Sequence, residues 1–291
     1  MNVFHKSVLL KEVIDYLDVK KGKKYIDSTL GGGGHTLEVL ERGGIVLGVD
    51  QDQEAIDHIE KNFKFQISNF KLTIVRGNFR DIDKIAHLKG FDKVSGIIFD
   101  LGLSSHQIET SARGFSFLTE APLDMRMDKS LEVRARDLIN ALTEKELYEL
   151  FTKLGEEYNA RAISSAISRA RRIKPIETTT ELANIIKSVG RHEKIHPATK
   201  VFQALRIAIN DELNNLRESL PRAVGLLDKG GVLAIISFHS LEDRIVKNTF
   251  LEFSKEGIGT ILTKRPVEPN FEEIKENKRS RSAKLRIFRK N

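Results

Sequence analysis

A run of four glycines between two apolar stretches most constrains how this chain can fold. The sequence from Asp27 to His35 reads Asp-Ser-Thr-Leu-Gly-Gly-Gly-Gly-His, and the next apolar run, Ile45 to Val49, ends in Asp50. Glycines let a backbone turn tightly and approach a ligand without interference from a Cβ atom. The pattern predicts a strand, a glycine loop, a helix over Thr36 to Glu41, a second strand and an acid, in that order.

The spacing of this loop favours a nucleoside-containing cofactor. The amides at a helix N-terminus point at a bound group, and Asp50, 19 residues after Gly31, is placed to accept hydrogen bonds from ribose hydroxyls. Thr36 stands where a dinucleotide fingerprint needs Gly or Ala, and His35-Thr36 replaces the Lys-Ser/Thr of a phosphate-binding loop. S-adenosylmethionine fits a glycine loop and a ribose acid without a diphosphate clamp. The alternative is a plain glycine-rich turn with a solvated Asp50.

The composition excludes several classes of protein. The 291 residues, 40% of them hydrophobic, supply a core for one large domain or two smaller ones. No apolar run approaches the length of a membrane span, and the first residues do not resemble a signal peptide. The absence of cysteine rules out disulfides and thiolate metal sites. We expect a cytoplasmic protein without a membrane or a metal.

The positive charge is concentrated near the C-terminus. The chain carries a net charge of +7, and the segment from Lys278 to Asn291 holds seven cations and no acid, so the other residues sum to zero. Concentrated positive charge attracts polyanions such as nucleic acid. The alternative is a solvated basic tail, but the alternation around Leu285 and Ile287 predicts a short strand that belongs to the fold.

The order of the expected elements predicts two kinds of domain. Alternating strands and helices predict an α/β fold with a parallel, doubly wound sheet. The expected strands are Lys24–Ser28, Ile45–Val49, Leu72–Arg76, Ser95–Asp100, Val232–Ser237, Thr260–Thr263 and Lys284–Phe288. Residues 105–196 instead show helical periodicity, and a long helix is expected from Pro197 to Leu220. We predict a sheet domain formed by residues 1–104 and 197–291, with residues 105–196 as an inserted helical domain.

Residues that follow the expected strands are candidates for chemistry, because ligands of open α/β sheets bind beyond the carboxyl ends of the strands. Phe79 follows the third strand and could cover an adenine ring or pack into the core. Asp100 ends the fourth strand, where a methionine amino group or the acceptor would lie. His239 follows the fifth strand and could face the acceptor, while Ser240 is expected to cap the next helix.

Two segments of the helical block mix arginines with aromatic or methionine side chains. They run from Arg113 to Phe117 and from Pro122 to Asp128. Arginines and aromatic rings together can hold phosphates and stack on bases, which would make Arg113 and Arg126 contacts to RNA. Alternatively, both segments form a loop that packs across the top of the sheet through its Phe and Met side chains.

Motifs that recur in order along nearly the whole chain resemble one family. They are His5 to Leu10, the glycine loop with His35, Asp100 to Gly102, Arg113 to Phe117, Pro122 to Asp128, His196 to Thr199, Phe202 to Arg206, Ser237 to Arg244 and Ser282 to Arg286. With these motifs the sequence is similar to the bacterial ribosomal RNA small-subunit cytidine N4-methyltransferases of the MraW type.

The resemblance implies a class I methyltransferase (Rossmann-like) fold with an inserted helical domain, and S-adenosylmethionine as methyl donor. It also implies that the acceptor is the exocyclic N4 of a cytidine in the decoding centre of small-subunit ribosomal RNA. By matching motif positions, it implies donor contacts from Gly33, Gly34, His35, Asp50, Phe79, Asp100 and Gln107. We expect RNA contacts from Arg113, Arg126, Lys278, Arg279, Arg281, Lys284 and Arg286.

Alternatives to this function stay open. One is a methyltransferase of the same fold that acts on another RNA or on a small molecule. Another is a non-catalytic RNA-binding protein that keeps the cofactor as a structural ligand. A homodimer is also open.

The expected chemistry is an in-line displacement of the methyl group from a sulfonium, which depends mainly on alignment. The cytosine amine is a poor nucleophile because its lone pair is delocalised into the ring, so a group that takes its proton would help. We expect Asp100 to organise the donor and His239 or Asp124 to approach the amine. The base must be presented to the pocket, for example by flipping.

Overall fold

The protein divides into two compact units. The computed structural model of the chain describes residues 7–69, 71–104, 107–108, 110–189 and 196–291. The first unit combines residues 1–104 with 213–291 and is called the sheet unit, and the second, residues 105–212, is called the helical unit. A helical block inserted into an α/β domain is therefore found, although its end lies later than residue 196.

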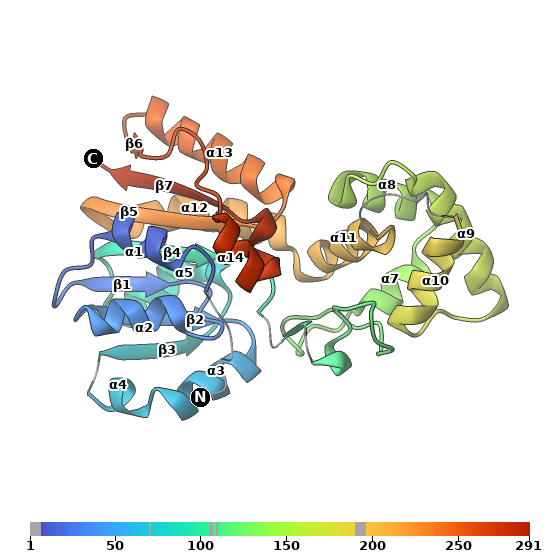
Figure 1. Cartoon of the computed structure of the whole chain (residues 1–291), viewed down its shortest axis with the longest axis horizontal. Helices are drawn as coiled ribbons and strands as arrows, with labels where there is room; N and C mark the ends of the chain where they lie inside the picture. The colour runs from blue at the N-terminus through green and yellow to red at the C-terminus, as the bar shows by residue number, and fades with distance from the viewer. Residues whose placement is uncertain (1–6, 70, 105–106, 109, 190–195) are drawn as a thin grey trace. The chain divides into compact units, whose positions relative to one another are not determined.

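The sheet unit is built on a seven-stranded sheet with the order β3-β2-β1-β4-β5-β7-β6 (Figure 1). The strands are β1 (Lys24–Asp27), β2 (Ile45–Asp50), β3 (Leu72–Arg76), β4 (Val94–Asp100), β5 (Leu227–Ser237), β6 (Gly259–Ile261) and β7 (Lys284–Lys290). The strands from β1 to β5 pair in parallel, whereas β7 is antiparallel to both β5 and β6. The predicted doubly wound α/β sheet is confirmed.

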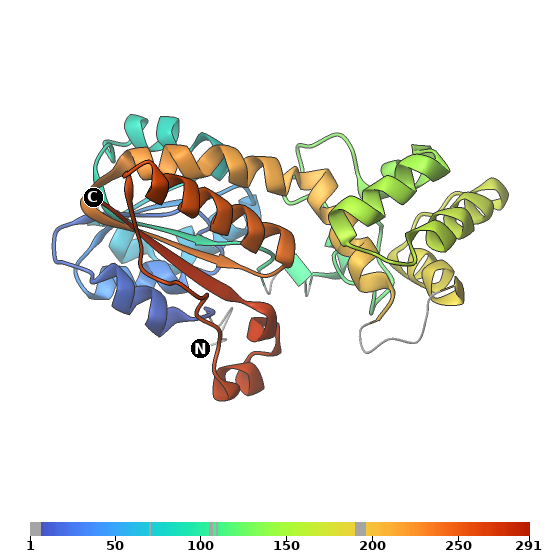
Figure 2. The same ribbon diagram turned by 90° about the horizontal axis from the view of Figure 1, so that it is seen from above.

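Helices cover both faces of this sheet (Figure 2). One face packs against α1 (Leu10–Leu17), α2 (Gly34–Glu41) and α3 (Gln53–Asn62), and the other against α5 (Ile82–Leu88), α12 (Glu212–Leu226) and α13 (Ser240–Lys255). The short helices α4 (Lys64–Ser68) and α14 (Phe271–Glu276) complete the unit. A strand covered on both faces reads as a continuous apolar run, which is what the sequence shows from Val232 to Ile236.

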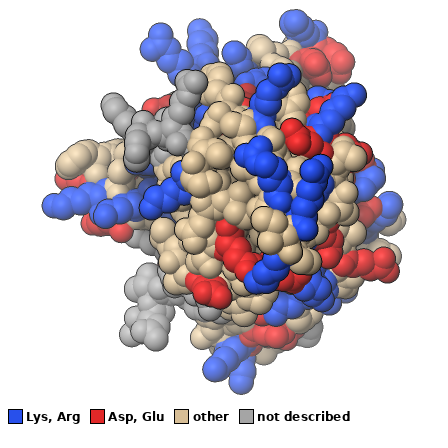
Figure 3. Space-filling view, turned by 90° about the vertical axis from the view of Figure 1, so that its right-hand side faces the viewer, with Lys and Arg blue, Asp and Glu red and all other residues tan. Residues whose placement is uncertain are grey.

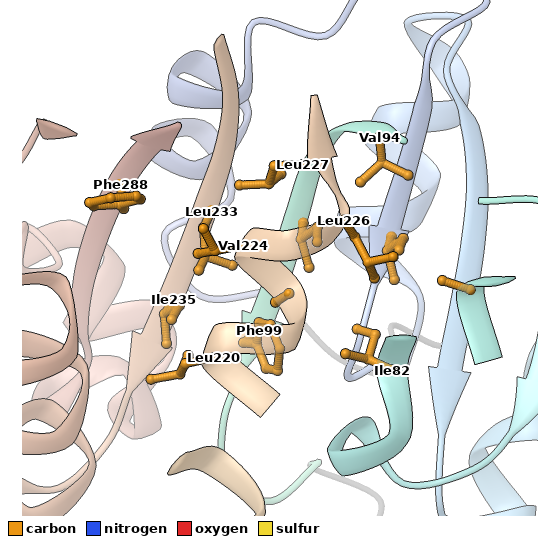
Figure 4. Close-up of a cluster of buried hydrophobic side chains, with 14 of the residues drawn as sticks. Ile82, Val94, Phe99, Leu220, Val224, Leu226, Leu227, Leu233, Ile235 and Phe288 are labelled. Atoms are coloured by element: carbon orange, nitrogen blue, oxygen red, sulfur yellow. The ribbon is translucent and has the colours of Figure 1, made fainter. Parts of the chain in front are cut away.

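The core between the sheet and α12 shows how these strands are buried (Figure 4). Leu220 and Val224 of α12 belong to the same buried cluster as Leu233 and Ile235 of β5 and Phe99 of β4. Burial of one such side chain contributes about 1.5–3 kcal/mol relative to exposure. This packing gives the carboxyl ends of β4 and β5 a rigid support.

The helical unit has a hydrophobic core of its own. Its helices are α7 (Ala135–Ala141), α8 (Glu144–Gly155), α9 (Ala160–Ile173), α10 (Thr179–Val189) and α11 (Ala198–Asn210). Thr143 and Glu146 form a capping box at the start of α8, and Thr178 and Glu181 bond reciprocally at the start of α10. Within the part of the chain that the structure describes, no helix is long and apolar enough to cross a membrane.

The prediction of one long helix from Pro197 to Leu220 is wrong, because the chain forms two helices there. Asp211 separates α11 from α12 with a left-handed backbone, φ 49°. Helix α11 buries Val201 and Leu205 in the core of the helical unit, whereas α12 buries Leu216 in the core of the sheet unit. Apolar periodicity runs through the break without Gly or Pro, and Asp is one of the few residues that tolerate this conformation.

Candidate active site

The carboxyl ends of the parallel strands bring several predicted residues to one edge of the sheet. Asp50 ends β2, Asp100 ends β4, and His239 follows the end of β5. Asp27 ends β1, which lies between β2 and β4. Phe79 begins a short 3-10 helix (Phe79–Asp81) after β3. The edge therefore gathers acidic, aromatic and imidazole groups from separate parts of the chain, as the rule for open sheets predicts.

The glycine loop is shaped by close packing of the protein around it. Gly33 has φ 77° at the N-terminus of α2, and its N–H donates to the Leu30 carbonyl at 2.8 Å. A Cβ at Gly33 would lie 2.5 Å from Ile59 Cδ1, and a Cβ at Gly34 would overlap Ser7 Oγ. Both positions therefore need glycine, and the loop is held between α3 and the segment that precedes α1.

The carboxylate of Asp50 is bonded to the loop. The N–H of Gly31 donates to its Oδ2 and the N–H of Asp52 to its Oδ1, both at 2.8 Å. Burial raises the pKa of Asp50 to about 6, even though the two amide hydrogen bonds favour the ionised form. Each carboxylate oxygen has two lone pairs, so each retains one for a ribose hydroxyl. Asp50 is thus tied to the loop instead of standing as a solvated surface acid.

Asp27 is a second carboxylate of this edge, and sequence reasoning did not single it out. Its Oδ2 accepts the Thr36 hydroxyl at 2.7 Å, and its Oδ1 accepts the Thr29 N–H at 3.2 Å. Burial raises the pKa of Asp27 to about 6. The signal was present in the sequence, since the acid stands directly between an apolar strand and a glycine loop. Asp27 joins the end of β1 to α2.

The carboxyl of Asp100 has an unused acceptor. Its backbone N–H donates to Thr29 Oγ1 at 2.7 Å, and its Oδ2 lies 3.8 Å from Nδ1 of His35. Its Oδ1 is buried and has no hydrogen-bond partner among the residues that the structure describes. Burial raises the pKa of Asp100 well above its usual value, and the nearby Asp27 and Glu242 carboxylates add to this.

Asp100 therefore suits a cationic ligand. A buried acceptor without a partner is costly, and an ammonium group would supply both a hydrogen bond and the charge that ionises the carboxyl. The methionine amino group of S-adenosylmethionine is such a group. A buried acceptor without a partner, in a site that also holds a glycine loop and the carboxylate of Asp50, thus fits this cofactor.

His35 is buried between a backbone carbonyl and Asp100. Its Nε2 lies 3.2 Å from the Val8 carbonyl oxygen, which can only accept a hydrogen bond. Nε2 therefore carries a proton, and Nδ1 is the ring atom that lies nearer to Asp100. His35 is thus held by the protein next to the glycine loop. The predicted contact of His35 to the donor stays a prediction.

His239, and not Ser240, caps helix α13. The Nδ1 of His239 accepts the N–H of Glu242 at 3.3 Å, and Glu242 Oε2 accepts the N–H of Phe238 at 2.8 Å. Ser240 is itself the first helical residue, so the expected cap was one residue late. Since Nδ1 accepts, the proton of a neutral His239 is on Nε2, which lies 3.2 Å from Glu242 Oε1. With Nδ1 engaged by this amide, Nε2 is the ring atom of His239 left for a further hydrogen bond, and the role of His239 toward the acceptor stays a prediction.

Phe79 and Gln107 lie in different surroundings. Phe79 is partly buried, and its ring meets that of Phe99 edge to face with centroids 5.6 Å apart. It therefore packs on the core and keeps some exposed surface at the site edge. Gln107 is buried in the helical unit. The donor contacts predicted for both residues stay predictions.

Arg113 and Arg126 form hydrogen bonds within the helical unit, and the RNA contacts expected of them stay predictions. Arg113 is buried, and its Nη2 donates to the carbonyls of Arg126 and Met127 at 3.1 and 2.9 Å. Arg126 binds both oxygens of Asp124, at 2.7 and 2.8 Å. Burial opposes ionisation of Asp124, but the bonds from Arg126 prevail and lower its pKa. Met125 packs in the core of the helical unit, and not across the top of the sheet as the alternative supposed.

Arg286 is also internal, because it forms a buried ion pair with α13. Its Nε lies 2.6 Å from Asp243 Oδ1, and its Nη2 lies 3.1 Å from Oδ2. The segment around it is strand β7, so the predicted strand is confirmed and a solvated tail is excluded. Of the other predicted RNA contacts, Lys278 and Arg281 are exposed, while Arg279 and Lys284 are partly exposed.

Exposed cations are also found in the helical unit, for example Arg169 and Arg172 of α9. Figure 3 shows Lys and Arg side chains interspersed with Asp and Glu side chains on the face that it presents. That face is therefore of mixed charge, in contrast to the strongly basic sequence between Lys278 and Asn291.

The expectation of no metal stays a prediction. His192 and His196 stand four residues apart, a spacing that on a helix places both side chains on one face. His192 lies outside the described residues, as do His5 and Lys6 of the first motif of the family resemblance. The ring of His196 stacks on that of Phe117, with centroids 4.6 Å apart.

Fold and site together define a Rossmann-like methyltransferase that uses S-adenosylmethionine. The parallel sheet with an antiparallel β7, the glycine loop bonded to Asp50 and the buried Asp100 oxygen without a hydrogen-bond partner among the described residues support this assignment. The chain belongs to the MraW methylase family, whose model matches residues 2–291.

Similar proteins cover the chain almost completely. A Persephonella marina protein named ribosomal RNA small subunit methyltransferase H is 46% identical over 294 residues, covering 99% of both chains. A Coprothermobacter proteolyticus protein of the same name is 46% identical over 289 residues, covering 98% of this chain and 96% of that one. A solved rRNA methylase from Streptococcus thermophilus aligns with a TM-score of 0.46 at 10% identity, covering 98% of this chain and 97% of that one.

Proposed function

We propose that the protein methylates the exocyclic N4 of a cytidine in the decoding centre of small-subunit ribosomal RNA. The observation that carries this proposal is the 46% identity, along almost the whole chain, to proteins named ribosomal RNA small subunit methyltransferase H. The basic segment between Lys278 and Asn291 supports an RNA substrate, because positive charge attracts the phosphate backbone.

The donor would be held by the edge of the sheet. S-adenosylmethionine supplies a methyl group that is activated on a sulfonium. Asp50 would accept its ribose hydroxyls, Asp100 would bind its ammonium group, and Phe79 would lie against its adenine ring. Gly33, Gly34 and His35 would complete the pocket within the sheet unit, and the donor contact of Gln107, in the helical unit, stays a prediction.

The remaining work of the site is to align the acceptor and to keep water out. Good alignment alone can supply a large part of a rate enhancement. His239 would donate a hydrogen bond from Nε2 to the acceptor base, since its Nδ1 is engaged by the Glu242 amide. Asp124 is held by Arg126, so we do not assign the amine proton to it.

The RNA would be bound by cations of the C-terminal segment that face the solvent. They are Lys278 and Arg281, with Arg279 and Lys284 partly exposed. Because β7 runs antiparallel to β5, its first residue, Lys284, pairs with Ser237 at the carboxyl end of β5. Lys284 therefore lies at the same edge of the sheet as Asp50 and Asp100, and the other three cations belong to the 3-10 helix (Lys278–Ser282) that precedes it in the chain.

The test is to incubate the protein with methyl-labelled S-adenosylmethionine and unmethylated small ribosomal subunits, then to digest the RNA and identify the labelled nucleoside. We expect label in N4-methylcytidine at one position. Asp100→Asn should reduce transfer at least about 100-fold, because it loses a charged hydrogen-bond partner of the donor. Asp83→Asn, on α5, is the matched control and should transfer normally. Label in another nucleoside, or only in a small molecule, would support the alternative substrates instead.

Two further expectations belong to this proposal. Action on ribosomal RNA places the protein in the cytoplasm, which fractionation of cells would test. The homodimer remains a prediction, and analytical ultracentrifugation of the free protein would distinguish one chain from two.

A further inference from the structure

Glu273 of α14 is bonded to a segment that lies on the donor site. Its Oε1 accepts the N–H of Leu9 at 2.7 Å, although the two residues are 264 positions apart. We infer that Glu273 is a positioning residue, which holds the strap Ser7–Leu9 against the glycine loop and so keeps His35 beside Asp100. This inference rests on the proposed donor site.

The strap needs such a tether because its backbone is strained. Leu9 is fully buried and has φ 52° and ψ 33°, a left-handed conformation that is unfavourable for a leucine. A residue in this conformation persists only where its surroundings hold it there. The bond from Glu273 fixes the amide of this residue, at the N-terminus of α1.

The strap contacts two successive residues of the loop. Ser7 Oγ fills the space that a side chain at Gly34 would need. The Val8 carbonyl, next to Leu9, lies 3.2 Å from Nε2 of His35. A shift of the strap would therefore move the support of the loop and change the hydrogen bond that orients the imidazole.

The orientation of His35 matters for Asp100. With Nε2–H directed to the Val8 carbonyl, Nδ1 is left 3.8 Å from Asp100 Oδ2. Asp100 presents its other oxygen, Oδ1, without a hydrogen-bond partner among the described residues. A series of contacts therefore connects Glu273, through Leu9, Val8 and His35, to Asp100, the carboxyl that we propose binds the ammonium group of the donor.

Helix α14 can act here because of the topology of the sheet. It precedes β7, whose first residue pairs with the last residue of β5, so α14 belongs to the carboxyl edge (Figure 1). Among its own residues none is buried, and Phe271 is 80% exposed. A helix with so little core of its own depends on specific bonds such as that of Glu273 for its position.

The test compares Glu273→Ala with Glu272→Ala, a change of the exposed neighbouring acid, by calorimetry of S-adenosylmethionine binding without RNA. We expect Glu273→Ala to weaken binding about 5- to 20-fold, or about 1–2 kcal/mol, while Glu272→Ala stays within twofold of the wild type. Glu273→Gln should restore binding, because its amide oxygen can still accept the Leu9 N–H. If Glu273→Ala does not fold, Glu273→Asp, with a shorter reach, replaces it and should show the smaller end of this loss.

A second readout separates positioning from general stability. In protein labelled with ¹⁵N-histidine, the imidazole signals of His35, assigned with His35→Gln, should report Nε2–H in the wild type and a changed tautomer balance in Glu273→Ala. Normal donor binding by folded Glu273→Ala, or equal losses in Glu272→Ala, would overturn the inference. Because the assay contains no RNA, failure of the proposed ribosomal substrate would leave these results unaffected.

Discussion

The carboxylate of Asp50 joins the glycine loop to β2 and keeps one acceptor lone pair on each oxygen. We predict that Asp50→Asn weakens S-adenosylmethionine binding about 10- to 100-fold, since hydrogen bonds to a charged group contribute about 1.5–3 kcal/mol. Isothermal titration calorimetry at pH 7.5 measures the effect. Asp52→Asn is the control, because Asn caps a helix as well as Asp does. Equal affinity in both variants would remove Asp50 from the donor site.

Donor binding should also depend on pH through the same residue. The pKa of Asp50 is raised to about 6, and ribose hydroxyls donate best to the ionised form. Affinity should therefore be constant above about pH 7 and fall about fivefold between pH 6 and pH 5, as the carboxyl takes up a proton. Calorimetry across this range tests the expectation, and in Asp50→Asn this part of the pH dependence should disappear.

The buried carboxyl of Asp27 should make the free energy of unfolding decrease as pH rises, whereas donor affinity should increase with pH. Burial raises the folded-state pKa of Asp27 to about 6, above its ordinary value of 3.8, so the folded state binds more protons than the unfolded state between these values. The free energy of unfolding should therefore fall as pH rises from about 4 to 6. Urea unfolding should show that Asp27→Asn gains stability relative to the wild type over this range, by about 1–3 kcal/mol. A difference that does not change with pH would contradict this.

At the scale of secondary-structure elements, the ion pair of Arg286 and Asp243 links β7 to α13. Removal of Arg286 leaves the buried carboxylate of Asp243 with only the longer ion pair to Lys284, at 3.9 Å, and breaking a buried pair costs about 3–5 kcal/mol. We predict a loss of this size for Arg286→Met in urea unfolding. The double variant Arg286→Met/Asp243→Leu should recover most of it. Arg289→Met, an exposed position of the same strand, should change stability by less than about 0.5 kcal/mol.

At the scale of the whole molecule, the two units have separate hydrophobic cores. We predict that a fragment of residues 105–212 folds on its own, because a compact unit with its own core can do so. Circular dichroism should show a helical spectrum and a cooperative thermal transition. Ile163→Ala, in this core, should lower the stability of the fragment by about 2–5 kcal/mol. A fragment without a cooperative transition would show that the core depends on the sheet unit.

Local patterns were sufficient for the elements and for much of the donor site. Strand β3 was expected over the residues that form it, and the capping box of Thr143 and Glu146 was visible as a motif. Asp50 and Asp100 could be placed at one edge without coordinates, because parallel strands put their carboxyl ends on the same side. These features depend on neighbours in the chain or on a general rule of sheet topology.

Pairings between distant residues could not be predicted in this way. Arg286 looked like a contact to RNA, and only the packing of β7 on α13 brings it to Asp243. Two other contacts also depend on the tertiary structure. They are the hydrogen bond from the Leu9 N–H to Glu273 and the hydrogen bonds that Arg113 donates to backbone carbonyls. The net charge of a sequence does not distinguish buried cations from exposed ones. Only the folded structure shows which arginines are paired with a group inside the protein.

The sequence by itself determined the α/β class, the helical insert, the glycine loop and the acids that follow the strands, because each leaves a periodic or local signal. The tertiary structure alone decided the break at Asp211, the cap by His239 and the unpartnered oxygen of Asp100. The physical reason is that backbone strain, burial and the pairing of polar atoms depend on which distant elements pack together.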